Sequence, residues 1–148
     1  MNNLKHVWSI LCANSSVDQK TNTISLFNVL EQINIEKKAL NVAKGAQKNL
    51  VATINFQLVS LWKKEVEQKK FKIEQKVEVV DSYGKILASA SMPLEVPEAQ
   101  KRMRVINNFN GLPISTTGEY LFKIFFKEEA SGKFIEQAAV PLVVKEKD

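Results

Sequence analysis

The sequence predicts an all-β protein: an antiparallel β-sandwich of two sheets, immunoglobulin-like or C2-like, with about seven or eight strands. Three observations support this class. Apolar residues recur at every second position in most segments, as in strands with one buried face. Segments containing Gly, Asp and Asn separate these runs, as tight turns do. No convincing long helical pattern is present, and the length of 148 residues suffices for a single domain over residues 1–148 with its own core.

The clearest element is a hairpin over residues 118–144. In its first arm large apolar residues alternate with Lys123 and Lys127, which take the opposite face. Ser131 and Gly132 form the turn, because glycine can adopt the positive φ that tight hairpins need. We expect the apolar face to enter the core; it consists of Tyr120, Phe122, Ile124 and Phe126.

A second hairpin is predicted from residues 71–80 and 86–94. The four residues from Asp81 to Gly84 between them are a strong turn signal. Proline lacks the N–H that a central strand needs, so Pro93 and Pro97 place the returning strand at a sheet edge or at a crossing between sheets.

Other segments read as strands with less regular patterns. Residues 6–16 are apolar on both faces, which is typical of a strand covered on both sides. Residues 23–35 are rich in β-branched residues, but their apolar positions change phase, as at a β-bulge. Residues 50–62 and 101–109 alternate more regularly. Residues 36–49 show no clean alternation, so we expect an irregular connection there, with room for one helical turn.

A helix over residues 58–73 is an alternative to two strands joined by a loop. Lys69 interrupts the apolar stripe of this helix, and no capping residue stands at its start, so the two strands are favoured. The apolar face of the helix would hold Leu58, Trp62, Val66 and Ile73.

The chain opens with two motifs: Trp8-Ser9-Ile10-Leu11-Cys12-Ala13 and, after a polar turn, Asn22-Thr23-Ile24-Ser25-Leu26-Phe27-Asn28-Val29-Leu30-Glu31. They resemble the start of an uncharacterised family of small bacterial β-sandwich proteins, a domain of unknown function, mainly over residues 7–35. The patterns from Gly118 to Phe122 and from Val140 to Val144 agree with this resemblance. It implies the sandwich fold, and it brings no activity and no site residues.

The net charge of +5 comes from 19 lysines and two arginines. Lysine is a strongly hydrated point charge, whereas arginine is the usual contact for phosphates and base edges, so this excess favours solubility. Glutamates interleave with the lysines of residues 63–76, as on a solvated face with cross-strand ion pairs. The alternative is a patch for a polyanion, with Trp62 or Phe71 stacking on bases and with salt-sensitive binding. The residues of this patch are Lys63, Lys64, Lys69, Lys70, Lys72, Lys101, Arg102 and Arg104.

Few side chains can support catalysis or metal binding. The chain has one histidine, one cysteine and three aspartates, which are too few for a zinc site and too scattered for calcium, so we expect no metal and no cofactor. His6 and Cys12 lie about 20 Å apart along a straight strand, too far for a catalytic pair. The single cysteine excludes an internal disulfide and fits a reducing compartment. Paired carboxylates remain the enzymatic alternative, from Glu31, Glu95, Glu119 and Glu136.

We therefore predict a cytoplasmic, non-catalytic binding or interaction module of unknown ligand. A non-specific nucleic-acid-associated protein is the second hypothesis and a carboxylate enzyme the third. Leu121 and Phe125 lie on the lysine side of the aromatic strand; either a neighbouring segment covers them, or they contact a partner protein or a second copy. No apolar run reaches the roughly 18 residues of a membrane-spanning helix.

Overall fold

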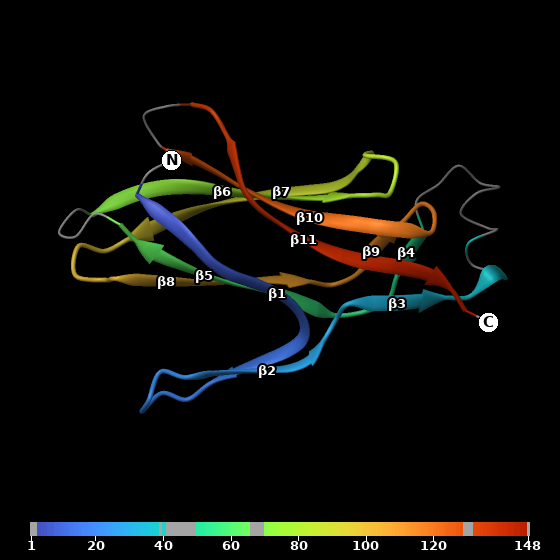
Figure 1. Cartoon of the computed structure of the whole chain (residues 1–148), viewed down its shortest axis with the longest axis horizontal. Helices are drawn as coiled ribbons and strands as arrows, with labels where there is room; N and C mark the ends of the chain where they lie inside the picture. The colour runs from blue at the N-terminus through green and yellow to red at the C-terminus, as the bar shows by residue number, and fades with distance from the viewer. Residues whose placement is uncertain (1–2, 39, 41–49, 66–69, 129–131, 148) are drawn as a thin grey trace.

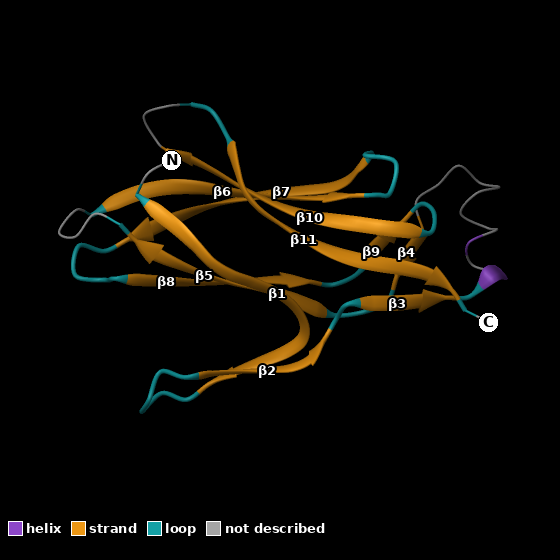
Figure 2. Cartoon of the chain, in the orientation of Figure 1, coloured by secondary structure: helices purple, strands orange, loops and turns teal. Residues whose placement is uncertain are grey.

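Two β-sheets face each other and share one core in the computed structural model, which describes residues 3–38, 40, 50–65, 70–128 and 132–147 (Figure 1). Strands dominate this part of the chain (Figure 2). The predicted all-β sandwich is therefore confirmed. The described residues form strands β1 to β11 rather than seven or eight, because two predicted strands each divide into two and the turn before residue 118 holds another short one.

Sheet A has the strand order β2 (Ile24–Val29), β1 (Leu4–Val17), β5 (Phe56–Lys64), β8 (Arg102–Phe109). Sheet B has the order β3 (Gln32–Ile35), β11 (Ile135–Glu146), β10 (Gly118–Glu128), β6 (Phe71–Val80), β7 (Ile86–Val96). A small third sheet pairs β4 (Leu50–Ala52) with β9 (Leu112–Ile114). Most pairs are antiparallel, as predicted, but β3 runs parallel to β11.

Both predicted hairpins are present, β6 with β7 and β10 with β11. Strand β7, which carries Pro93, lies at the edge of sheet B as its prolines predict. The helical alternative for residues 58–73 is wrong, because β5 and β6 occupy the described part of that range. The predicted helical turn begins at Lys37, and the N–H of Leu40 donates to the carbonyl of Glu36 at 3.2 Å.

The β-bulge expected in residues 23–35 is absent from the pairing of β2 with β1, where Phe27 and Val29 are exposed on the face opposite Ile24 and Leu26. Strand β2 pairs with β1 in unbroken register. The chain then leaves sheet A, and the carbonyl of Glu31 accepts the N–H of Val143 at 3.0 Å where β3 joins sheet B. After the crossing, Ile33 and Ile35 of β3 pack against the core from sheet B.

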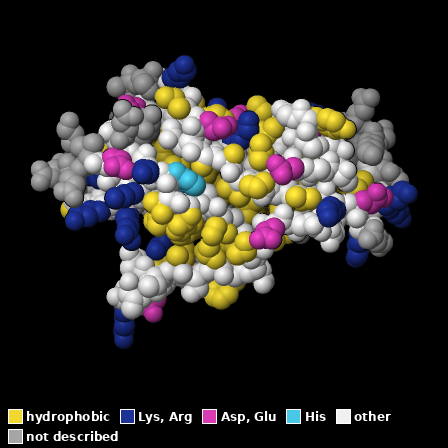
Figure 3. All heavy atoms as spheres, viewed as in Figure 1, with side chains coloured by type: hydrophobic (Ala, Val, Ile, Leu, Met, Phe, Trp, Pro, Cys, Tyr) yellow, Lys and Arg dark blue, Asp and Glu magenta, His cyan; other side chains and the backbone are white. Residues whose placement is uncertain are grey.

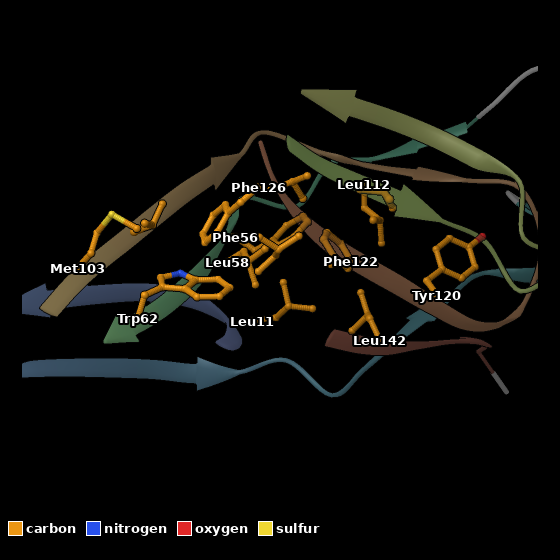
Figure 4. Packing of buried hydrophobic residues seen from close by; sticks show 14 of the residues in the cluster. Leu11, Phe56, Leu58, Trp62, Met103, Leu112, Tyr120, Phe122, Phe126 and Leu142 are labelled. Carbon is orange, nitrogen blue, oxygen red and sulfur yellow. The ribbon is translucent and has the colours of Figure 1, made fainter. Parts of the chain in front are cut away.

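The core between the sheets is rich in aromatic residues (Figure 4). Phe122 and Phe126 are fully buried, which confirms the predicted stripe on β10. The ring of Trp62 lies 4.4 Å from that of Phe126, measured between centroids, and Phe56 packs edge-on against Phe122 at 5.7 Å. Such tilted contacts add to the stabilisation that burial of these side chains provides.

The second half of β1 and the whole of β2 fold beneath β5 and β8 of the same sheet, because β1 bends sharply (Figure 1). The hydroxyl of Ser15 donates to Gln57 Oε1 at 2.6 Å, which fixes this hairpin to β5. Val59, on the outer face of β5, is fully buried. Because the β1–β2 hairpin covers the outer face of sheet A here, β1 is apolar on both faces. In the described part of the chain, no helix is long and apolar enough to cross a membrane.

Candidate binding surface

Three cationic side chains lie side by side on the outer face of sheet A. The strand register places Lys5 of β1 opposite Lys63 of β5, and Lys63 opposite Arg102 of β8. Residues directly opposite on neighbouring strands share a face, with Cβ atoms about 5 Å apart. We call these three residues the basic row. Figure 3 shows Lys and Arg side chains gathered on the left of the view, the side where Figure 1 labels β5 and β8.

The basic row is an arrangement of like charges on adjacent strands. All three side chains are exposed, and among the described residues no carboxylate lies within ion-pair distance of any of them. Like charges directly opposite each other destabilise a sheet. An anion bound across the row would remove this repulsion and gain from all three charges.

Arg104 continues the basic face along β8, two residues beyond Arg102, but it has a structural partner. Its guanidinium donates to the carbonyl oxygen of Asn22 at 3.2 Å and to the side-chain oxygen of Asn22 at 3.4 Å. Its Nε is buried and has no hydrogen-bond partner within the described chain. Arg104 therefore holds the tip of the β1–β2 hairpin near sheet A.

The other predicted polyanion contacts do not join the row. Lys64 points to the core side of sheet A, where its buried ammonium donates to the carbonyls of Pro97 and Glu98, both at 3.0 Å. Lys70 forms an ion pair with Glu95 at 2.7 Å, and the hydrogen bond and charge of Glu95 raise the pKa of Lys70. Lys72 lies opposite Glu95 on sheet B.

Two predicted cations remain. The backbone of Lys101 pairs with that of Lys64 just before β8, beside the basic row, and Lys69 lies outside the described residues. The row also contains a residue that sequence reasoning missed, Lys5. The predicted first strand begins at residue 6 and leaves Lys5 out, and the position of Lys5 beside Lys63 depends on the pairing of β1 with β5.

The proposed stacking surface is wrong for Trp62. Its side chain is fully buried, in contact with Phe126 and with the ring of His6. Phe71 is half-buried on sheet B, with the Lys64 ammonium 5.7 Å from its ring centroid. Neither ring lies on the face that carries the basic row.

Leu121 and Phe125 lie half-buried on the outer face of sheet B. The ammonium of Lys76 lies 4.6 Å from the ring centroid of Phe125, and ion pairs surround it, including Lys127 with Glu74 at 3.0 Å. Side chains of this chain therefore cover Phe125. This face carries the ion pairs that the interleaved lysines and glutamates of residues 63–76 predict. Contact of Leu121 and Phe125 with a partner stays a prediction.

Some of the exposed apolar residues lie on the β1–β2 hairpin and at the bulge of β1. Val7, Phe27 and Val29 are about half exposed, at 50%, 49% and 52%. Figure 3 shows hydrophobic side chains gathered along β1 and β2, below the single histidine.

The reactive side chains have structural partners. The His6 ring nitrogen Nε2 lies 2.7 Å from the hydroxyl of Ser9, and burial lowers the pKa of His6. Burial raises the pKa of the Cys12 thiol, although the backbone hydrogen bond with Asn14 opposes this shift. A bulge after His6 puts His6 and Cys12 on opposite faces of β1. Among the described residues, no group of three or more His, Cys, Asp or Glu could hold a metal ion.

Two glutamates line a hollow of about 680 Å³ over β6 and β7. Glu74 pairs with Lys127 and Glu95 with Lys70. The hydrogen bond from Lys70, together with its charge, lowers the pKa of Glu95. A carboxylic acid that donates a proton to a leaving group needs a raised pKa, so this hollow does not resemble a glycosidase pair.

No protein-family model matches the chain, and no curated protein is significantly similar to it. Among solved structures, part of a β-glucuronidase from glycoside hydrolase family 2 is similar, with a TM-score of 0.46 and 18% sequence identity. The similarity covers 65% of this chain and 11% of that one, so the chain spans about a tenth of that protein. At this TM-score and identity, the likeness supports no conclusion about this chain.

Proposed function

We propose that the protein is a non-catalytic β-sandwich binding module whose partner is an acidic protein surface. The observation that carries this proposal is the basic row, in which Lys5, Lys63 and Arg102 occupy adjacent strands without carboxylate partners among the described residues. The repulsion between these charges destabilises the folded protein, and a bound partner with clustered carboxylates reduces this repulsion.

An acidic protein fits this face better than a nucleic acid does. Val7, half exposed, is two residues from Lys5 on β1, and a mixed apolar and cationic surface suits a protein partner. Binding of single-stranded nucleic acid uses open aromatic rings, whereas Trp62 is buried. A non-specific nucleic-acid-associated protein is the second candidate, because the same row would contact phosphates.

A role without catalysis is supported by the partners of the reactive groups. Asp81 accepts a hydrogen bond from the hydroxyl of Ser115, His6 contacts the hydroxyl of Ser9, and Cys12 is fully buried. A carboxylate enzyme is the third candidate, and the ion pairs of Glu74 and Glu95 weaken it. We place the module in the cytoplasm, because a buried free thiol at Cys12 suits a reducing compartment.

A titration with three polyanions tests the proposal. Poly-L-glutamate, single-stranded DNA and double-stranded DNA of matched charge are added to the protein at about 50 mM and 200 mM salt, with binding followed by fluorescence anisotropy. We expect poly-L-glutamate to bind most tightly and to weaken at the higher salt. Tighter binding of either DNA would replace the proposal with the nucleic-acid alternative. No binding of any polyanion at low salt would overturn both.

A further inference from the structure

Strand β8 is an edge strand of sheet A with an unbroken register. Its 8 residues pair one by one with β5, from Arg102 opposite Lys63 to Phe109 opposite Phe56. No other strand of the described chain pairs with its far side. A regular edge of this length offers a row of backbone donors and acceptors to another strand.

The register shows which backbone groups face the open edge. The N–H of Lys64 donates to the carbonyl of Lys101 at 2.9 Å, so this pair is a hydrogen-bonded one. Such pairs alternate with non-hydrogen-bonded pairs along an antiparallel ladder. The N–H and C=O groups that point away from β5 therefore belong to Arg102, Arg104, Ile106 and Asn108. Among the described residues, the one hydrogen bond made there is from the side chain of Gln100 to the carbonyl of Arg102, at 2.7 Å.

The other long strands with an open side carry protective features that β8 lacks. Strand β7 contains Pro93 and an irregular register near Val79, and β11 contains Pro141 and a bulge opposite Ile124. Strand β1 has a bulge at Val7. Prolines and bulges are two of the means that keep edges from pairing; charged side chains are another, and β8 carries Arg102 and Arg104. The absence of prolines and bulges from β8 leaves this edge competent to pair.

The space beside β8 can receive the side chains of an added strand. A hollow of about 220 Å³ lies between β7 and β8, with Val77, Ala90 and Met92 on the side of sheet B. Asn107 projects from β8 toward sheet B, where its amide lies 3.4 Å from the sulfur of Met92. Small apolar side chains fit this inner side. On the outer side, the position next to Arg102 is the vacant fourth place of the basic row.

We propose that β8 binds an extended segment of the acidic partner by antiparallel strand addition. This inference rests on the proposed function and names the form of its ligand. In the segment, carboxylates stand opposite Arg102 and Arg104, an aliphatic residue stands opposite Ile106, and small apolar residues alternate with them to face the hollow. Backbone bonds to Arg104, Ile106 and Asn108 supply affinity, and the carboxylates supply selectivity.

A capped peptide of sequence Thr-Ala-Val-Ala-Glu-Ala-Glu tests the pairing. In the antiparallel register its threonine stands opposite Asn108 and its last glutamate opposite Arg102. One N-methylated form carries methyl groups on the backbone nitrogens of the threonine, the valine and the first glutamate. In the unmodified peptide, the N–H groups of these three residues point to β8. The matched control carries the methyl groups on the three alanines, whose N–H groups point away. Affinity for the full-length protein is measured by calorimetry.

We expect the first N-methylated form to bind about ten-fold or more weakly than the control, because it loses three backbone hydrogen bonds. The peptide should also slow amide exchange at Arg104, Ile106 and Asn108 in ¹⁵N-labelled protein. Equal binding of both methylated forms, or protection of amides on another strand, overturns strand addition. If poly-L-glutamate still binds in that case, the basic row remains a site for an acidic partner. If neither peptide nor poly-L-glutamate binds, the proposed function fails as well.

Discussion

Lys63 on β5 lies directly opposite Arg102 on β8, with Lys5 opposite Lys63 on the other side. Three cations in register on adjacent strands are unfavourable for the folded sheet on its own. A surface that lowers stability and is nevertheless built from three separate strands is the kind of feature found where a protein binds something. Stability and binding should therefore respond in opposite directions to the same substitution.

The substitution Lys63→Glu should stabilise the protein. It changes two repulsive cross-strand pairs into attractive ones, each worth about 0.2–1 kcal/mol. The measurement is the urea midpoint at low salt and at 1 M salt, where screening should remove most of the gain. Lys72→Glu on sheet B makes the same change of charge but faces Glu95, so it should lower the midpoint. A loss of stability in Lys63→Glu would contradict the repulsion assigned to the row.

Tyr120→Phe should destabilise the corner that leads into β10. The phenol oxygen accepts the N–H groups of Ser115 at 3.0 Å and Thr116 at 3.2 Å, and it donates to the carbonyl of Thr116 at 2.6 Å. Loss of this buried hydroxyl leaves backbone groups unsatisfied and should cost about 1–3 kcal/mol in the free energy of unfolding. Tyr83→Phe is the control, since Tyr83 is 85% exposed, and its midpoint should stay unchanged.

Gly118→Ala should destabilise more than Gly84→Ala. A Cβ at residue 118 would lie 2.6 Å from the Cβ of Ser82, and the φ of +123° is one that L-residues rarely adopt. Gly84 has a φ of +85° but no atom within 4 Å of a Cβ, so alanine there brings a backbone cost of about 1 kcal/mol without the clash. Thermal unfolding of both variants makes the comparison. Equal shifts would mean that Ser82 moves aside freely.

The stability of the protein should fall as the pH drops through the ordinary titration range of His6. Burial lowers the pKa of His6 in the fold below the value of 6.5 for an unfolded chain, so the unfolded state binds more protons in that range. The contribution of the neutral imidazole is complete above pH 6.5 and declines below it. Unfolding of wild type and His6→Gln at pH 7.5 and pH 5.5 measures this, and the variant should lose less stability between the two. An identical loss in both proteins would assign the pH dependence to other groups.

Local patterns in the sequence were sufficient for the hairpins. Residues 71–94 and 118–144 each pair with their own neighbours across a short turn, so alternation and turn residues determine both the strands and their partners. The crossing at Glu31 could not be located from the sequence, because the apolar phase changes earlier, between Leu26 and Phe27, while β2 is still paired with β1.

The basic row could be predicted only in part. Lys63 and Arg102 were identified as cations, but their proximity depends on the register between β5 and β8, and that of Lys5 on the bulge at Val7. No local pattern encodes the pairing of strands so far apart along the chain. Lys64 was predicted to belong to the basic patch and does not. It is next to Lys63 in sequence, but its side chain points to the other face of β5, where it is buried and donates to two backbone carbonyls.

The decisive measurement is the affinity of the Lys63→Glu protein for poly-L-glutamate, by fluorescence anisotropy at low salt. We expect this variant to lose most of its affinity for poly-L-glutamate although it is more stable than wild type. The Lys72→Glu protein, with the same net charge, should keep nearly all of it. Equal affinity in the two variants would mean that net charge governs binding, and it would contradict a binding site at the basic row.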